Sequence, residues 1–375
     1  MCRLWWQAGH QRVWRSIQLR DSLGYVKDLT RRKHFASLVE TITFQPGDNT
    51  LANGQKTIQF LDFKRLIAVN SHGSNYDGVR LENVKSLIVS SLRSWVVEES
   101  DVRRRSDHGT DDITVMSALS TKAASLHTLD IDMNCDDSLG PVIYEMLDNL
   151  SALEHLDMRS IGEILHQTYP PDVFLQKVLT NKPSLTTVSF THGVDFSAGD
   201  VNGFLARMDR NWSIPSLRSF GRPCFNSVSA ATGLIARMPN VEELIFTVID
   251  RTGNFGTNVN NLFTFMSTVR QLTSIDLELE GDDCGFDGSW LVQLGALEAL
   301  GTFAVSLYRP EVVTITGAQL AGFLVSSQKL KYLTLDLGTV VVHCSVEEQV
   351  AIQNAIGRIQ EVDFGGITLA IQHTI

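Results

Sequence analysis

The chain has 375 residues, of which 43% are hydrophobic and 20% charged, and its formal net charge is −10. This composition is typical of a folded protein with a large core and excludes a wholly disordered chain. The acidic balance argues against a general nucleic-acid binder, which needs a cationic surface to meet phosphates, and it favours basic partners. No stretch reaches the roughly 18 consecutive apolar residues of a membrane-spanning helix.

The first 14 residues, MCRLWWQAGHQRVW, contain three of the six tryptophans, Trp5, Trp6 and Trp14. Polar residues interrupt every apolar run here, so the stretch does not read as a secretory signal peptide. Each tryptophan can bury roughly 150–250 Å² of surface. We therefore expect the three rings to cap the exposed end of the repeat array described below.

The pattern is less regular up to residue 125. Residues 25–38 predict a connecting helix, and residues 54–70 predict one amphipathic helix. The charged run 96–112 predicts a solvated loop. Short strands are expected at the apolar triplets Val39/Ile42/Phe44 and Val84/Leu87/Val89.

From residue 126 onward a repeat of the form L-x-x-L-x-L dominates the sequence. Its copies begin 24 to 32 residues apart, about 29 on average, at Leu126, Leu153, Leu185, Leu217, Val241, Leu272, Leu300, Leu330 and Ile359. The copy at Leu217 is degenerate, because Arg222 stands where the third apolar residue is expected. Within a copy the apolar alternation predicts a short strand with one buried face.

Between the copies the apolar spacing becomes helical, and Thr316/Gln319 and Ser345/Glu348 have the capping-box form that begins a helix. One strand and one helix per unit return each strand parallel to the last, and stacked units share one core. A doubly wound α/β domain is the alternative, but its glycine-rich phosphate loop after the first strand is absent.

This pattern resembles the leucine-rich repeats of the longer class, in the irregular form of fungal F-box proteins. The resemblance implies an α/β solenoid, or horseshoe, with a parallel concave sheet, convex helices and repeats of about 29 residues. Three regions follow from it: an F-box-like remnant and cap over residues 1–35, irregular first repeats over 36–125, and the leucine-rich-repeat array over 126–375.

The N-terminal run Cys2-Arg3-Leu4-Trp5-Trp6, with Val13-Trp14-Arg15 and the expected strand Ser16-Ile17-Gln18-Leu19 after it, resembles the C-terminal half of a fungal F-box. The family's Leu-Pro start is not found. Such proteins are substrate receptors of SCF-type ubiquitin ligases, in which the F-box binds the linker subunit. The resemblance implies a cytoplasmic or nuclear adaptor, or a derivative that has lost ligase docking, with these candidate docking or cap residues: Leu4, Trp5, Trp6 and Trp14.

The alternation assigns the residues between and beside the apolar positions to the concave sheet, the surface that repeat proteins use for binding. Of 27 such positions from residue 126 onward, nine are acidic and one, Arg159, is basic; His155, Gly221, Pro223 and Tyr332 are on the same face. We expect this face to bind a basic protein segment. Its acids are Asp130, Asp132, Asp157, Glu243, Asp276, Glu278, Asp336, Glu361 and Asp363.

No motif for catalysis is present: there is no G-x-S-x-G, G-x-x-x-x-G-K-S/T or H-E-x-x-H, and no cofactor is expected. The acid-rich segment 281–288 predicts a turn rather than a calcium loop, since it lacks the ligand order of one. Five scattered cysteines favour a reducing compartment and no metal site. A small-molecule binder or a cofactor-independent enzyme, for example of a fungal metabolic pathway, is the alternative to protein binding.

Overall fold

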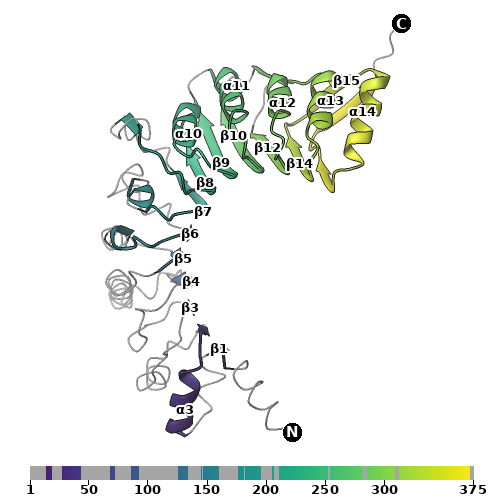
Figure 1. Ribbon diagram of the computed structural model, residues 1–375. Helices are drawn as coiled ribbons and strands as arrows, with labels where there is room; N and C mark the ends of the chain where they lie inside the picture. The colour runs from purple at the N-terminus through teal and green to yellow at the C-terminus, as the bar shows by residue number, and fades with distance from the viewer. Residues whose placement is uncertain are drawn as a thin grey trace, which may run out of the picture. The chain divides into compact units, whose positions relative to one another are not determined.

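The computed structural model describes residues 14–18, 28–43, 68–71, 86–92, 126–133, 145, 147–159, 176–180, 182–195, 205–206, 211–251, 254–281, 285–308 and 312–371. The chain divides into two compact units, Met1–Leu185 and Thr186–Ile375, called unit 1 and unit 2 below. Both are built of parallel strands, and the strands of unit 2 alternate with helices (Figure 1). The predicted α/β class with a large parallel sheet is therefore confirmed.

In the part of unit 1 that the structure describes, six strands pair in chain order, each parallel to the next. The apolar residues of the predicted copies face the core, since Ile42, Leu129 and Leu156 are fully buried. The bounds are β1 Ser16–Gln18, β2 Thr41–Thr43, β3 Ala68–Ser71, β4 Ser86–Leu92, β5 Thr128–Met133 and β6 His155–Arg159.

The helix α3, Leu29–Ala36, lies within the predicted helix 25–38 and begins at Asp28, whose carboxylate accepts the N–H of Arg31 at 2.8 Å. The strands expected near residues 17, 42 and 87 are confirmed as β1, β2 and β4. The predicted helix 54–70 is wrong at its end, because residues 68–70 belong to β3. There Val69 pairs with Ile42 on one side and Leu87 on the other, and this pairing overrides the helical spacing.

Unit 2 has a sheet in the order β7-β8-β9-β10-β12-β14-β16, again parallel throughout. The strands follow one another at the predicted repeat positions, and Leu244, Ile275, Phe303, Leu333 and Val362 stand in one register. The bounds are β7 Thr187–Asp195, β8 Ser219–Phe225, β9 Glu243–Asp250, β10 Ser274–Gly281, β12 Thr302–Tyr308, β14 Tyr332–Asp336 and β16 Glu361–Asp363.

Five helices of unit 2 lie side by side along one face of these strands (Figure 1). Both predicted capping boxes, Thr316 with Gln319 and Ser345 with Glu348, are present and begin the last two of them. The bounds are α10 Val228–Ile235, α11 Phe255–Met266, α12 Ser289–Leu294, α13 Gly317–Ser326 and α14 Val346–Ile356.

The core of unit 2 lies between this helix layer and the sheet. Phe263 of α11 stacks on Trp290 of α12 with ring centroids 4.5 Å apart. Phe303 of β12 meets Trp290 at 5.8 Å and Phe323 of α13 at 5.6 Å. Because each ring contacts its neighbour in the next repeat, the repeats of unit 2 share one continuous apolar interior.

Two short parallel pairs accompany the large sheet of unit 2: β11 Gly285–Asp287 with β13 Val312–Thr314, and β15 Val340–Cys344 with β17 Ile367–Ile371. No apolar repeat of the sequence predicts these two pairs. The segment 281–288, predicted as a turn, is wrong for residues 285–287, which form β11. The short motif has too few alternating residues to reveal a pairing that depends on the next repeat.

Candidate functional site

The side of the unit 2 sheet that faces away from the helices forms a regular grid, which we call the open face. Along each strand its residues alternate with buried ones, and across the strands they stand in register. The open face comprises Glu243, Ile245, Thr247, Ser274, Asp276, Glu278, Thr302, Ala304, Ser306, Tyr332, Thr334, Asp336, Glu361 and Asp363.

Six carboxylates project from this grid, and all six are exposed. Within the described parts of unit 2 no ion pair involves any of them. Adjacent parallel strands are only about 4.8 Å apart, so these like charges repel one another unless solvent or a partner screens them. The six are Glu243, Asp276, Glu278, Asp336, Glu361 and Asp363.

Asp276 shows the electrostatic consequence. Partial burial raises the pKa of its carboxyl group, the charge of Glu278 two residues along raises it further, and Arg222 opposes both effects. Glu278 is held in place by Thr247, whose hydroxyl donates to its carboxylate at 3.0 Å. A cation at this point is therefore favoured by both carboxylates.

Asp336 and Asp363 form a second acidic pair at the other end of the grid. Asp363 accepts the N–H of Gly365 at 2.9 Å. A Cβ atom added at Gly365 would lie 2.9 Å from both the Cα and the Oδ1 of Asp336. Gly365 has a φ of +48°, so a glycine suits this close approach, and both aspartates lie beside its backbone.

Strand β8 departs from the grid and corrects the sequence analysis. Arg222, in the place of a core residue, has a φ of 64° and is exposed, whereas Gly221 and Pro223, predicted on the open face, are buried. The register with β9 shifts between Gly221 and Cys224, so β8 contains a bulge. A bulge adds one residue and redirects the side chains after it, which places a cation beside the acids of β10.

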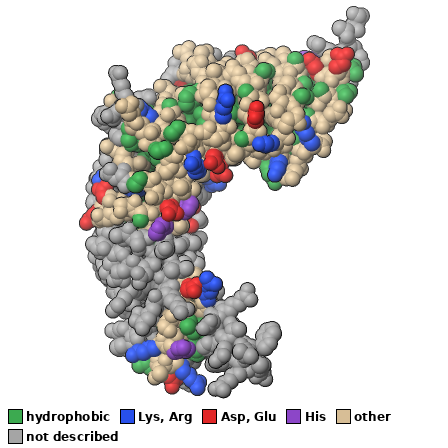
Figure 2. Space-filling model, viewed as in Figure 1, with side chains coloured by type: hydrophobic (Ala, Val, Ile, Leu, Met, Phe, Trp, Pro, Cys, Tyr) green, Lys and Arg blue, Asp and Glu red, His purple; other side chains and the backbone are tan. Residues whose placement is uncertain are grey.

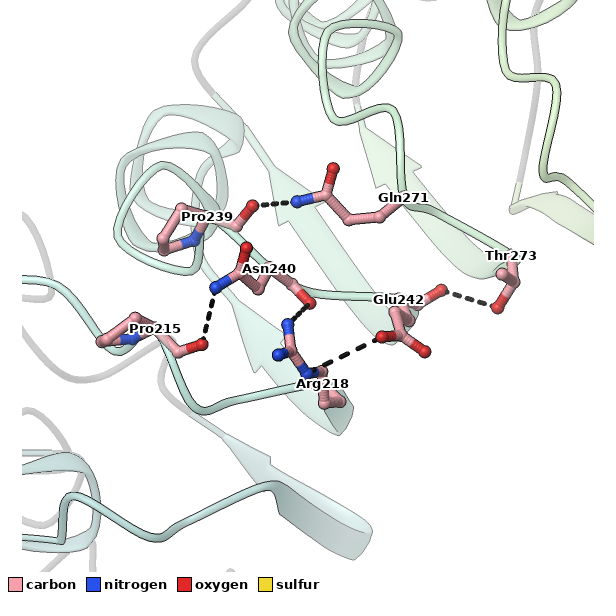
Figure 3. Close-up of polar contacts among 7 residues, drawn as sticks. All are labelled: Pro215, Arg218, Pro239, Asn240, Glu242, Gln271 and Thr273. Atoms are coloured by element: carbon pink, nitrogen blue, oxygen red, sulfur yellow. Dashed lines mark hydrogen bonds and ion pairs between the residues drawn. The ribbon is translucent and has the colours of Figure 1, made fainter.

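The acid just before β9, Glu242, has an arginine partner, unlike the acids on the open face. Glu242 lies 3.7 Å from the guanidinium of Arg218, and the Arg218 guanidinium also donates to the Asn240 carbonyl at 2.9 Å (Figure 3). Gln271 and Thr273 of the next repeat donate to the carbonyls of Pro239 and Glu242 (Figure 3). These contacts join successive repeats and leave Glu242 neutralised.

Contacts of the same kind are found where the strands begin in both units. The carbonyl of Glu242 accepts the N–H groups of Thr273 and Ser274, and Gly301 and Lys331 accept equivalent pairs from the repeats after them. In unit 1, Glu40 pairs with Arg15, and Glu154 lies 3.8 Å from the His127 ring. The edge acids Glu40 and Glu242 thus have cationic neighbours, whereas the open-face acids of unit 2 have none in ion-pair range among the described residues. Figure 2 shows that the viewed side of unit 2 mixes both signs of charge.

In unit 1 the predicted face residues Asp130 and Asp157 are directly opposite in register, as are Asp132 and Arg159. Asp130 and Asp157 are half-buried and His155 is exposed; the side chains of Asp132 and Arg159 lie outside the described residues. The backbone register thus sets Asp130 beside Asp157 on neighbouring strands.

Of the predicted cap residues, Trp14 is described and stacks on Phe35 of α3 with ring centroids 4.1 Å apart. Leu4, Trp5 and Trp6 lie outside the described residues. Stacking on the helix α3 is the contact expected of a capping ring.

The described residues contain no group of three or more potential metal ligands. Asp287, in the acid-rich segment 281–288, accepts the N–H of Ser289 at 2.8 Å, and hydrogen bonds from Ser289 lower the pKa of its carboxyl group. None of the helices over the described ranges is both long and apolar enough to cross a bilayer. Cys224 and Cys344 are buried, and Cys344 forms no disulfide.

Comparison with protein-family models finds no model that matches this chain, and comparison with curated protein sequences finds no match either.

Proposed function

We propose that this protein is a leucine-rich-repeat binding module whose open face holds a basic segment of another protein. The carrying observation is the contrast between the two sets of acids in unit 2. Glu242 at the sheet edge is paired with Arg218, whereas six exposed carboxylates on the open face have no ion-pair partner among the described residues. A lysine- or arginine-rich segment relieves their mutual repulsion.

We also propose that the protein acts inside the cell as a substrate receptor of an SCF-type ubiquitin ligase, or as a derivative of one. Two observations support this part. The N-terminal segment resembles part of an F-box, and the buried thiol of Cys344, which forms no disulfide, suits a reducing compartment. Co-purification of the full chain with the ligase linker subunit tests docking. Retention that is lost in a Trp5→Ala/Trp6→Ala variant is expected, and no retention of the unmodified chain contradicts it.

Binding by the open face is tested with a short lysine-rich peptide and fluorescence anisotropy. The triple variant Asp276→Asn/Glu278→Gln/Asp336→Asn removes three exposed charge partners at about 0.5 kcal/mol each, which is roughly ten-fold in Kd. The matched control is Glu242→Gln, which removes an acid of the same unit that is already paired. Equal losses in the two variants would show that the open face is not the binding surface.

A pH titration of Asp276 tests the contact between the open face and the peptide independently. Because Glu278 helps to raise the pKa of Asp276, a bound ammonium or guanidinium group should lower that pKa toward its ordinary range. Carboxyl chemical shifts followed by NMR with and without the peptide measure this. An unchanged Asp276 titration in the presence of saturating peptide argues against binding there.

A further inference from the structure

The charges of the open face and of the neighbouring bulge change strand by strand in unit 2. Strand β8 presents the cation Arg222, and β10 presents Asp276 and Glu278. Strands β14 and β16 present Asp336 and Asp363. The strands between them, β9 and β12, carry uncharged residues at the same level of the grid: Ile245, Thr247, Ala304 and Ser306.

Three charged stations therefore follow one another across the sheet. The first is the guanidinium of Arg222, which the bulge turns out of the core position. The second is the carboxylate pair of β10, fixed on one side by the Thr247–Glu278 hydrogen bond. The third is the aspartate pair that converges on Gly365.

The spacing of the stations determines which backbone can reach all three. Neighbouring strands are about 4.8 Å apart, so every second strand is roughly 9.6 Å away. A polyproline II helix has three residues per turn and a rise of 3.1 Å per residue, so residues i, i+3 and i+6 point to one side at steps of roughly 9.3 Å. A β-strand, with a period of two, turns residues i and i+3 to opposite sides.

We propose that unit 2 recognises a mixed-charge segment in the polyproline II conformation, lying across the strands, with an acidic residue at i and basic residues at i+3 and i+6. The acidic side chain pairs with Arg222, whose planar guanidinium matches a carboxylate. The two basic side chains meet the carboxylates of β10 and of β14 and β16. This inference rests on the proposed function, since it specifies the segment that the open face binds.

Peptides of identical composition test the charge order. The full chain is titrated with the labelled peptide Glu-Pro-Pro-Lys-Pro-Pro-Arg and with its isomer Lys-Pro-Pro-Glu-Pro-Pro-Arg. Exchanging the first two charges makes two attractive contacts repulsive, so the isomer should bind about ten-fold more weakly. A third peptide with one proline moved, so that the charges stand at i, i+2 and i+6, should lose most of the advantage.

A charge-reversal variant separates a loss of binding from a loss of folding, because a variant that prefers a different peptide must still be folded. The variant Arg222→Glu should prefer Lys-Pro-Pro-Lys-Pro-Pro-Arg to the first peptide, which reverses the preference of the unmodified chain. The control Arg251→Gln removes a cation that lies 3.9 Å from Glu280 and should leave the preference unchanged. Equal binding of the two isomers overturns the inference and leaves the proposed function standing. Binding of no basic peptide at all overturns the proposed function.

Discussion

Asp250 is the buried charge on which the helix layer of unit 2 depends. It ends β9, its side chain is fully buried, and one carboxylate oxygen accepts the N–H of Val228 at 3.2 Å and the side-chain amide of Asn258 at 3.1 Å. Val228 is the first residue of α10 and Asn258 lies in α11. One carboxylate thus holds the beginning of one helix and the first turns of the next.

Replacing Asp250 with alanine removes these bonds and leaves the buried N–H of Val228 and the half-buried amide of Asn258 without this acceptor. Hydrogen bonds to a charged group contribute about 1.5–3 kcal/mol each, and a carboxylate near a helix N-terminus adds up to about 1 kcal/mol. Ser227 still caps α10 through the N–H of Ala230, so the helix does not lose every contact at that end. We therefore expect Asp250→Ala to lower the free energy of unfolding by about 3–4 kcal/mol and Asp250→Asn by about 1–2 kcal/mol.

Urea denaturation followed by far-UV circular dichroism measures these changes. Glu243→Ala is the matched control, because Glu243 lies on the same strand, is exposed and belongs to the open face. That substitution should alter the unfolding free energy by no more than about 0.5 kcal/mol. The reasoning is refuted if Asp250→Ala unfolds within about 0.5 kcal/mol of the control.

Three further predictions concern stability. Burial lowers the pKa of Lys182 to about 8. Because the unfolded chain holds that proton up to about pH 10.5, stability should rise between about pH 8 and 10.5, by about 3 kcal/mol. Urea titrations at several pH values should show a smaller rise for Lys182→Met. Gly365→Ala should cost about 2 kcal/mol in the same assay, since its φ is +48° and its Cβ would meet Asp336, whereas Gly322→Ala, in an open helical position, should stabilise by about 0.5–1 kcal/mol. Ser345→Ala removes the cap of α14, which should lower the free energy of unfolding by about 1 kcal/mol and so lower the thermal midpoint. Ser229→Ala, at an exposed serine, is the reference and should leave the thermal midpoint unchanged.

Periodicity accounts for what the sequence predicted well. The apolar triplets at Val241, Leu272, Leu300 and Leu330 locate β9, β10, β12 and β14, and the same alternation assigns Asp276 and Glu278 to the open face. The reason is local: a strand with one buried face alternates every second residue, whatever lies beside it. The signals for the starts of α13 and α14 are equally local, since a capping box depends only on its own four residues.

The failures share a different cause, because they depend on neighbouring chain segments. The strand β3 replaces the end of a predicted helix because Val69 finds partners on both sides, and β11 exists because β13 of the next repeat pairs with it. Neither partner can be read from the segment itself.

The sequence by itself therefore determined the repeat, its strands and the acidic character of one face. Only the tertiary structure decided that Arg222, in the place of a missing core residue, stands beside those acids, because a bulge in β8 shifts its register against β9. The tertiary structure also decided which acids have a cationic neighbour. Arg218 and Glu242 meet across successive repeats, so their pairing depends on how the repeats stack and not on the order of residues within one of them.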